Sequence, residues 1–177
     1  VGGDEIDSNT NGQVLGNEPG FNAPTANGTP QNGWTDGSNA YVSDGLYATA
    51  GFGGFTQSYA NFGFSIPENN EITGIEVRVE GADTGASSHS VNAELSWNGG
   101  SNFTNGENSG TFTFTDSVRS IGGQGELWGR TWTPAEFNNG NFILNIINQV
   151  SNIEEPMRID AIKVRVYHQA TGGGGGG

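Results

Sequence analysis

The stretch Ile72–Gly81, ITGIEVRVEG, decides the fold class because its apolar and charged residues alternate. The two sets are Ile75, Val77 and Val79, and Glu76, Arg78 and Glu80. A period of two places one set on a buried face and the other in water, as in an antiparallel sheet. We therefore predict a strand here, with the three apolar residues facing a core.

The same alternation recurs along the chain in short segments, and turn signals rich in Asn, Gly and Pro separate them. The segments are Asn61–Ile66, Val91–Trp97, Thr111–Thr115, Asn141–Ile147 and Ala161–His168. In the third of them Phe112 and Phe114 should share a face, and the Gly122–Gly123 pair predicts a turn. Several short antiparallel strands in a chain of this length predict an all-β, two-sheet, jelly-roll-like β-sandwich.

One short helix is predicted at Thr133–Phe137, TPAEF. Thr133 is a typical N-cap, Pro134 suits the first helical position, and Glu136 completes a capping box. Asn138–Gly140 should end this helix after about one turn.

Length and composition indicate one domain with flexible or extended ends. The chain has 177 residues, 31 of them Gly, and no Cys, so it has no disulfide framework. Residues 1–32 predict an extended N-terminal arm, residues 33–170 the β-sandwich, and residues 171–177 a glycine tail or linker. No apolar run approaches the ~20 residues that span a bilayer.

Charge excludes one class of partner. The net charge is −13, with six basic and 19 acidic residues. Such a surface repels phosphate backbones, so we expect no nucleic-acid binding. It suits calcium-rich or saline surroundings.

Five segments in this order resemble a β-sandwich module of bacterial, archaeal and phage extracellular and virion structural proteins. They are Gly33–Thr49, Phe62–Gly81, Leu95–Gly100, Leu127–Phe142 and Ile159–His168, and the Trp-Gly-x-Thr-Trp and Ile-Pro…Ile-Thr-Gly-Ile motifs are the most specific. The resemblance covers roughly residues 33–168. It implies a structural or adhesive role at a cell or virion surface, and it brings no catalytic residues.

Two segments carry possible calcium ligands. DSNTNGQVLGNE matches a calcium-loop pattern through Asp7, Asn9, Asn11 and Glu18. The flanks carry Gly and Pro, so no EF-hand can form, and a weak non-helical oxygen site or a series of Asx-turns remains. In the second segment, Asp36, Asn39 and Asp44 are either ligands at one edge of the sandwich or ordinary turn residues.

The aromatic residues and histidines give little support for chemistry. Trp34, Trp128 and Trp132 are possible ligand-facing aromatics, although core packing is the alternative for such residues. His89 and His168 lie in no catalytic motif, so we expect no enzyme.

Two functions remain open from the sequence. The first is a structural subunit of an extracellular filament or surface assembly, a homopolymer linked by donation of the N-terminal arm. Apolar residues of that arm would enter a neighbour: Ile6, Val14, Leu15 and Phe21. The alternative is a carbohydrate- or receptor-binding module of an adhesin or phage particle. Ca²⁺ is the one cofactor that either hypothesis includes.

Overall fold

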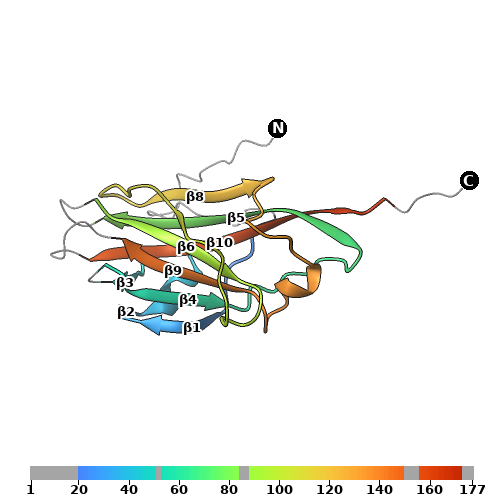
Figure 1. The fold of residues 1–177 in the computed structure, drawn as a ribbon. Coiled ribbons are helices and arrows are strands. Elements are labelled where there is room, and N and C mark those ends of the chain that lie inside the picture. Colours follow the sequence, from blue (N-terminus) through green and yellow to red (C-terminus); the bar gives the residue numbers. More distant parts are fainter. Residues whose placement is uncertain (1–19, 51–52, 84–87, 150–155, 173–177) are drawn as a thin grey trace, which may run out of the picture.

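The computed structural model describes residues 20–50, 53–83, 88–149 and 156–172. It is an all-β sandwich of two antiparallel five-stranded sheets (Figure 1), which confirms the predicted fold class. The first sheet has the order β1-β4-β9-β6-β7. Its strands are β1 Ala26–Asn32, β4 Thr56–Ala60, β9 Ile143–Gln149, β6 Ser90–Ser96 and β7 Glu107–Asn108.

The second sheet has the order β2-β3-β10-β5-β8. Its strands are β2 Trp34–Thr35, β3 Ala48–Ala50, β10 Met157–Ala170, β5 Asn70–Asp83 and β8 Ser117–Gln124. β5 and β10 have 14 residues each and pair with one another along their length. The predicted ITGIEVRVEG strand is the inner part of β5, with Ile75, Val77 and Val79 fully buried.

An irregularity in the β5–β10 ladder changes which residues of β10 face the core. In β10, Ile159 pairs with Gly81 and Ala161 pairs with Glu80, so Asp160 is an extra residue in a β-bulge. Core residues of β10 are odd-numbered before the bulge and even-numbered after it, from Ile162 onward. The bulge therefore places Asp160 and Ala161 together on the outer face of the sheet.

Some predicted strands are absent from the sheets. Asn61–Ile66 and Thr111–Thr115 join no ladder, and Asn61 and Gly63 have left-handed backbone angles (φ 57° and 69°). Phe62 and Phe112 are nevertheless buried, while Phe114 is 68% exposed, so the predicted common face of Phe112 and Phe114 is wrong. Backbone hydrogen bonds from single residues, such as Phe112 N–H to the His89 carbonyl (2.9 Å), replace a regular register there.

The Gly122–Gly123 turn prediction is also wrong, because both glycines lie inside β8 opposite Glu76 and Ile75. Gly122 has φ +75°, and an added Cβ would lie 2.3 Å from the Ile75 carbonyl oxygen. The free space admits the Trp128 indole, whose Nε1 donates to that same carbonyl at 3.0 Å. Gly122 therefore leaves the room that the Trp128 side chain occupies.

The described part of the predicted N-terminal arm belongs to the sandwich and does not extend away from it. Residues 26–32 form β1, which pairs with β4, and Thr29–Pro30 is a cis peptide. Phe21 packs on the chain's own second sheet, beneath the guanidinium groups of Arg78 (4.2 Å to the ring centroid) and Arg165 (5.8 Å).

The predicted helix is present as a 3₁₀ turn, η2, at Pro134–Phe137. The Glu136 carboxylate accepts from the backbone N–H of Thr133 at 2.8 Å, as a capping box requires. A second 3₁₀ turn, η1, spans Gly37–Tyr41. Neither these turns nor any other helix in the described residues is long and apolar enough to cross a membrane.

Candidate metal centre

Three carboxylates converge on the outer side of the second sheet. One oxygen each of Glu80, Asp116 and Asp160 lies within 4.8 Å of the other two. Glu80 and Asp160 are fully buried and Asp116 is partly buried. The three residues come from β5, from the β10 bulge and from the residue just before β8, so the site depends on the packed sheet.

Strand geometry explains why Glu80 and Asp160 meet. Glu80 has the parity of Glu76 and Arg78, which is the outward parity of β5. The bulge places Asp160 beside Ala161, the partner of Glu80, and on the same face. On its other side Glu80 pairs with Val118 of β8, and Asp116 lies two residues before Val118.

The loop that follows η1 holds two of the carboxylates by hydrogen bonds. The backbone N–H groups of Asp44 and Gly45 donate to Asp160 Oδ1 at 3.0 and 3.1 Å. The Tyr47 hydroxyl donates to Asp116 Oδ2 at 2.7 Å, and the Arg158 guanidinium lies 4.4 Å above the Tyr47 ring. These contacts fix the loop to the site.

The electrostatics favour binding a proton or a cation. Burial raises the pKa of Asp160, the Asp44 and Gly45 amides partly offset this, and the Asp116 and Asp44 charges raise it further. Burial and the bond to Asp116 raise the pKa of Tyr47 to about 12, so its hydroxyl stays a donor at neutral pH. Asp116 Oδ1 is buried without a hydrogen-bond partner among the described residues.

The three carboxylates can therefore hold a metal ion. All their donor atoms are oxygen, the type that hard cations such as Ca²⁺ and Mg²⁺ select. Backbone carbonyls and water complete the coordination of such ions in most proteins. A bound cation would neutralise three charges that otherwise repel one another.

The predicted ligands Asp36, Asn39 and Asp44 are not brought together as a set. Asp36 is exposed and has left-handed backbone geometry before η1, and Asn39 Nδ2 donates to the Tyr47 carbonyl. Asp44 Oδ1 accepts from Leu46 N–H in an Asx-turn. Only Asp44 touches the centre, through its backbone N–H.

The other predicted site residues divide into two groups. The tryptophans proposed as ligand-facing are buried: Trp34, Trp128 and Trp132 are 7%, 4% and 7% exposed. That prediction is wrong, and the core alternative holds. The remaining predicted ligands and arm residues lie outside the described residues: Asp7, Asn9, Asn11, Glu18, Ile6, Val14 and Leu15.

His89 is fully buried just before β6. Its Nδ1 lies 2.7 Å from Asp83 Oδ1, and its Nε2 has no hydrogen-bond partner in the described part of the chain. No described serine hydroxyl completes a Ser-His-Asp arrangement there.

Glu80, Asp116 and Asp160 were missed because they are far apart in sequence and lie in no spacing motif. A signal for Asp160 exists in the sequence RIDAIKV, where the apolar parity changes between Ile159 and Ile162. Such a change requires a bulge, and an acidic residue at a bulge is a candidate ligand.

No protein-family model matches this chain, and a search of curated proteins found no relative. Among solved structures it is similar to the CBM36-1 domain of a multidomain xylanase from the hindgut metagenome of Trinervitermes trinervoides. The TM-score is 0.42 at 10% sequence identity, and the match covers 85% of this chain and 98% of that domain.

Proposed function

We propose that this chain is a non-catalytic, extracellular β-sandwich module that binds Ca²⁺ at Glu80, Asp116 and Asp160 and binds carbohydrate beside it. The observation that carries the proposal is that exposed apolar side chains flank the metal centre. Leu46 is 58% exposed and Phe114 is 68% exposed. Each lies two residues from a residue that contacts or forms the centre, Asp44 and Asp116 respectively.

Calcium fits the centre better than a transition metal. The ligand set has no Cys or His, and carboxylate oxygens suit Ca²⁺ or Mg²⁺. Three carboxylates from two strands and a loop allow irregular geometry, which Ca²⁺ tolerates and Mg²⁺ does not. Extracellular calcium is abundant enough to fill a site of modest affinity.

Carbohydrate fits the surface beside the centre. An exposed aromatic ring such as Phe114 offers a flat apolar face to a sugar ring. A net charge of −13 disfavours polyanionic ligands. The binding-module hypothesis is preferred to the filament subunit as the main function because these features form one surface.

Isothermal titration calorimetry with Ca²⁺ and affinity electrophoresis in neutral polysaccharides test the two parts separately. We expect Asp116→Asn to weaken Ca²⁺ binding at least tenfold, because one of three charged ligands is lost. We expect Phe114→Ala to abolish retardation by polysaccharide while calcium binding persists. A comparison variant is Val42→Ala, which removes a 61% exposed aliphatic side chain that lies, like Leu46, two residues from Asp44, and it should leave most of the retardation if the aromatic ring is what binds.

The two parts fail in different ways. Calcium heat unchanged in Asp116→Asn would show that the ion binds elsewhere. Retardation that is absent for every neutral polysaccharide, or that Phe114→Ala leaves unchanged, would overturn the carbohydrate part alone.

A further inference from the structure

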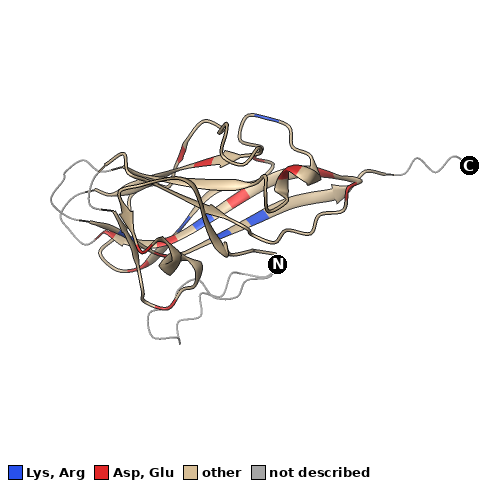
Figure 2. Cartoon of the chain, turned by 90° about the horizontal axis from the view of Figure 1, so that it is seen from below, with Lys and Arg blue, Asp and Glu red and all other residues tan. Residues whose placement is uncertain are grey.

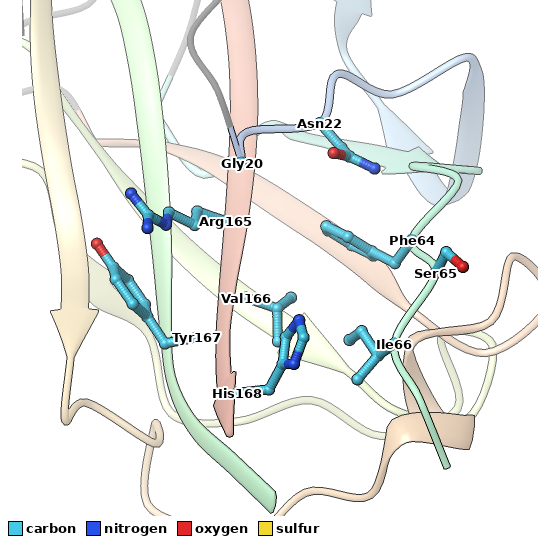
Figure 3. Close-up of a pocket in the computed structure, with 9 residues that line it drawn as sticks. All are labelled: Gly20, Asn22, Phe64, Ser65, Ile66, Arg165, Val166, Tyr167 and His168. Atoms are coloured by element: carbon cyan, nitrogen blue, oxygen red, sulfur yellow. The ribbon is translucent and has the colours of Figure 1, made fainter. Parts of the chain in front are cut away.

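A groove lies along the edge of β10, away from the metal centre. Its volume is about 340 Å³, and it is lined by Gly20, Asn22, Phe64–Ile66 and Arg165–His168. Figure 3 shows Val166 and His168 directed toward Phe64 and Ile66, while Arg165 and Tyr167 point to the other side of β10. One wall is thus a strand and the other an extended segment that joins no sheet.

β10 is open on this side beyond its first residues. β3 pairs only with Met157–Ile159. Farther along, Asn22 forms an isolated antiparallel bridge, with hydrogen bonds of 2.8 and 2.9 Å to the Val164 carbonyl and N–H. No other described segment pairs with this edge of β10.

The backbone of Val166 therefore faces the groove. In an antiparallel ladder, every second residue directs its N–H and C=O to the same side. Val164 bonds to Asn22, so Val166 directs the same groups to the groove side. Its partner on β5 agrees, since Ile75 N–H bonds to the Glu126 carbonyl and its C=O to Trp128, away from β10.

The groove offers an incoming strand apolar surface and, on the outer side of β10, the basic side chain of Arg165. Phe64 and Ile66 are only partly buried and border the core. Arg165 lies on β10, whose outer face and that of β5 carry four of the six basic residues: Arg78, Arg158, Lys163 and Arg165. Figure 2 shows basic and acidic positions intermixed on these long strands.

Residues 1–19 of this sequence match those properties. They carry four acidic and no basic side chains: Asp4, Glu5, Asp7 and Glu18. Their one adjacent apolar pair is Val14–Leu15, and a strand would direct one of the two to each face. Nineteen extended residues reach up to about 60 Å, enough to meet another molecule.

Gly20 of the same chain is not aligned to continue the Asn22 bridge. Extending that register would place Gly20 opposite Val166, yet Gly20 lies in a turn with φ +84°. That value is left-handed, outside the strand region. A strand in the groove is therefore more easily supplied by another molecule.

We propose that this groove receives residues 1–19 of a second copy of the chain. The incoming segment pairs with the Val166 backbone and places Val14 or Leu15 against Phe64 and Ile66. Each copy then offers one groove and one arm, a heterologous contact that links copies head to tail. This contact between copies requires neither the metal centre nor carbohydrate binding.

Sedimentation velocity of the full chain tests the contact between about 1 and 100 µM. We expect species above 18.5 kDa. The double variant Val14→Asp/Leu15→Asp should raise the concentration at half-association at least about tenfold, because the apolar anchor is lost. Asn9→Asp/Asn11→Asp adds the same two charges to residues 1–19 without removing apolar surface. It should shift the concentration at half-association much less.

Cross-linking identifies the two surfaces, since the natural chain has no Cys. One preparation carries Gln13→Cys and another carries His168→Cys, and the mixture is joined by a short bismaleimide. Mass spectrometry should find the 13–168 link in excess over a control mixture in which Ser101→Cys replaces His168→Cys.

Two results would overturn the proposal. One is a monomer at all concentrations. The other combines two observations. In the mixture, the 13–168 link is no stronger than the link in the Ser101 control, and a single chain that carries both cysteines forms the link within itself. That result would assign the groove to residues 1–19 of the same chain.

Discussion

Asp160 lies beside Glu80 because the extra residue of the β10 bulge puts Asp160 and Ala161 together on the outer face of the sheet. Without the bulge, the alternation that buries Ile159 would continue unbroken, and the outer face would carry one residue fewer at this point. The Asp160 carboxylate accepts hydrogen bonds from two backbone N–H groups of the Asp44–Gly45 turn. The same turn carries Leu46, so residue-level geometry connects the cation to the proposed ligand surface.

The first prediction is how the stability contributed by Asp160 depends on pH when a chelator keeps the protein free of calcium. The pKa of Asp160 is raised above the ordinary 3.8, chiefly by burial, so the protonated acid is the form that favours folding. That contribution is complete below about pH 3.8 and is lost as pH rises through the raised folded value. Thermal unfolding of Asp160→Asn, which still accepts from the turn amides, should therefore lose less stability than wild type between pH 4 and 7.

Calcium provides the control for this prediction. Saturating Ca²⁺ should restore the wild type at pH 7 and leave Asp160→Asn nearly unchanged. Parallel pH curves for the two proteins in chelator would contradict the assigned role of Asp160.

The second prediction concerns Gly122. Gly122→Ala should lower the free energy of unfolding by about 2–4 kcal/mol, from left-handed strain and from the clash with the Ile75 carbonyl and Trp128. Gly125→Ala is the matched control, because φ is +86° but nothing lies within 4 Å of the added Cβ. It should cost about 1–2 kcal/mol in urea unfolding. Equal losses would show that strain alone acts at Gly122.

At the scale of elements, η2 is held by one cation between two rings. The Arg130 guanidinium lies 4.1 Å from the Trp97 ring centroid and 4.4 Å from that of Trp132. It donates to both Glu136 oxygens, at 2.9 and 3.2 Å. Burial alone would raise the pKa of Glu136, but bonds from Arg130 and Thr133 outweigh it and lower that pKa.

The third prediction follows from this ion pair. Arg130→Met keeps an apolar stem between the rings and should lower the free energy of unfolding by about 1–2 kcal/mol at pH 7. A lowered carboxyl pKa stabilises above its ordinary value and loses that effect as pH falls through the folded value. The gap between variant and wild type should therefore narrow below about pH 4.5.

Arg119→Met tests whether the narrowing is specific to a carboxylate partner. Arg119 lies 5.7 Å from the Phe112 ring centroid and donates to the Thr111 carbonyl instead. The difference in unfolding free energy between Arg119→Met and the wild type should therefore stay constant with pH.

The long strands β5 and β10 were predictable because half-buried strands alternate over many residues. β2, β3 and β7 have two or three residues and no room for a period. β8 was hidden by two adjacent glycines, of which Gly122 leaves room for the Trp128 indole. Segments 61–66 and 111–115 alternate as strands do, yet ladder pairing depends on neighbours that a single segment cannot reveal.

The centre was harder to predict than the strands. Glu80 alternates as a solvated residue should, and it is buried only because β8 and the Asp44–Tyr47 loop pack around it. Asp116 is fixed by a Tyr47 hydroxyl 69 positions away. Asp36 and Asn39, by contrast, had the right composition but are used in a turn. The sequence indicated that the ligands would be carboxylate oxygens. Which carboxylates lie close together depends on tertiary packing, which the sequence did not reveal.

At the scale of the whole molecule, the charges of the two signs are unevenly arranged. The chain has 19 acidic residues, but most of its six basic ones lie on β5 and β10. Exposed charges that repel one another destabilise the compact state, and added salt screens them. Any polyacidic protein responds to salt in this way, so stabilisation by calcium must be separated from screening.

The last prediction makes that separation. Raising NaCl from about 10 to 150 mM shortens the screening length from about 30 to about 8 Å, and it should raise the Tm of wild type and Asp116→Asn by similar amounts. Calcium at about 1 mM, added in 150 mM NaCl, contributes little further screening and should raise the Tm of the wild type alone. Magnesium at the same concentration should act less, because irregular carboxylate geometry favours the larger ion. A calcium shift of equal size in Asp116→Asn would mean that Ca²⁺ acts through the general surface charge, and the three carboxylates would then be a buried acidic cluster without an ion.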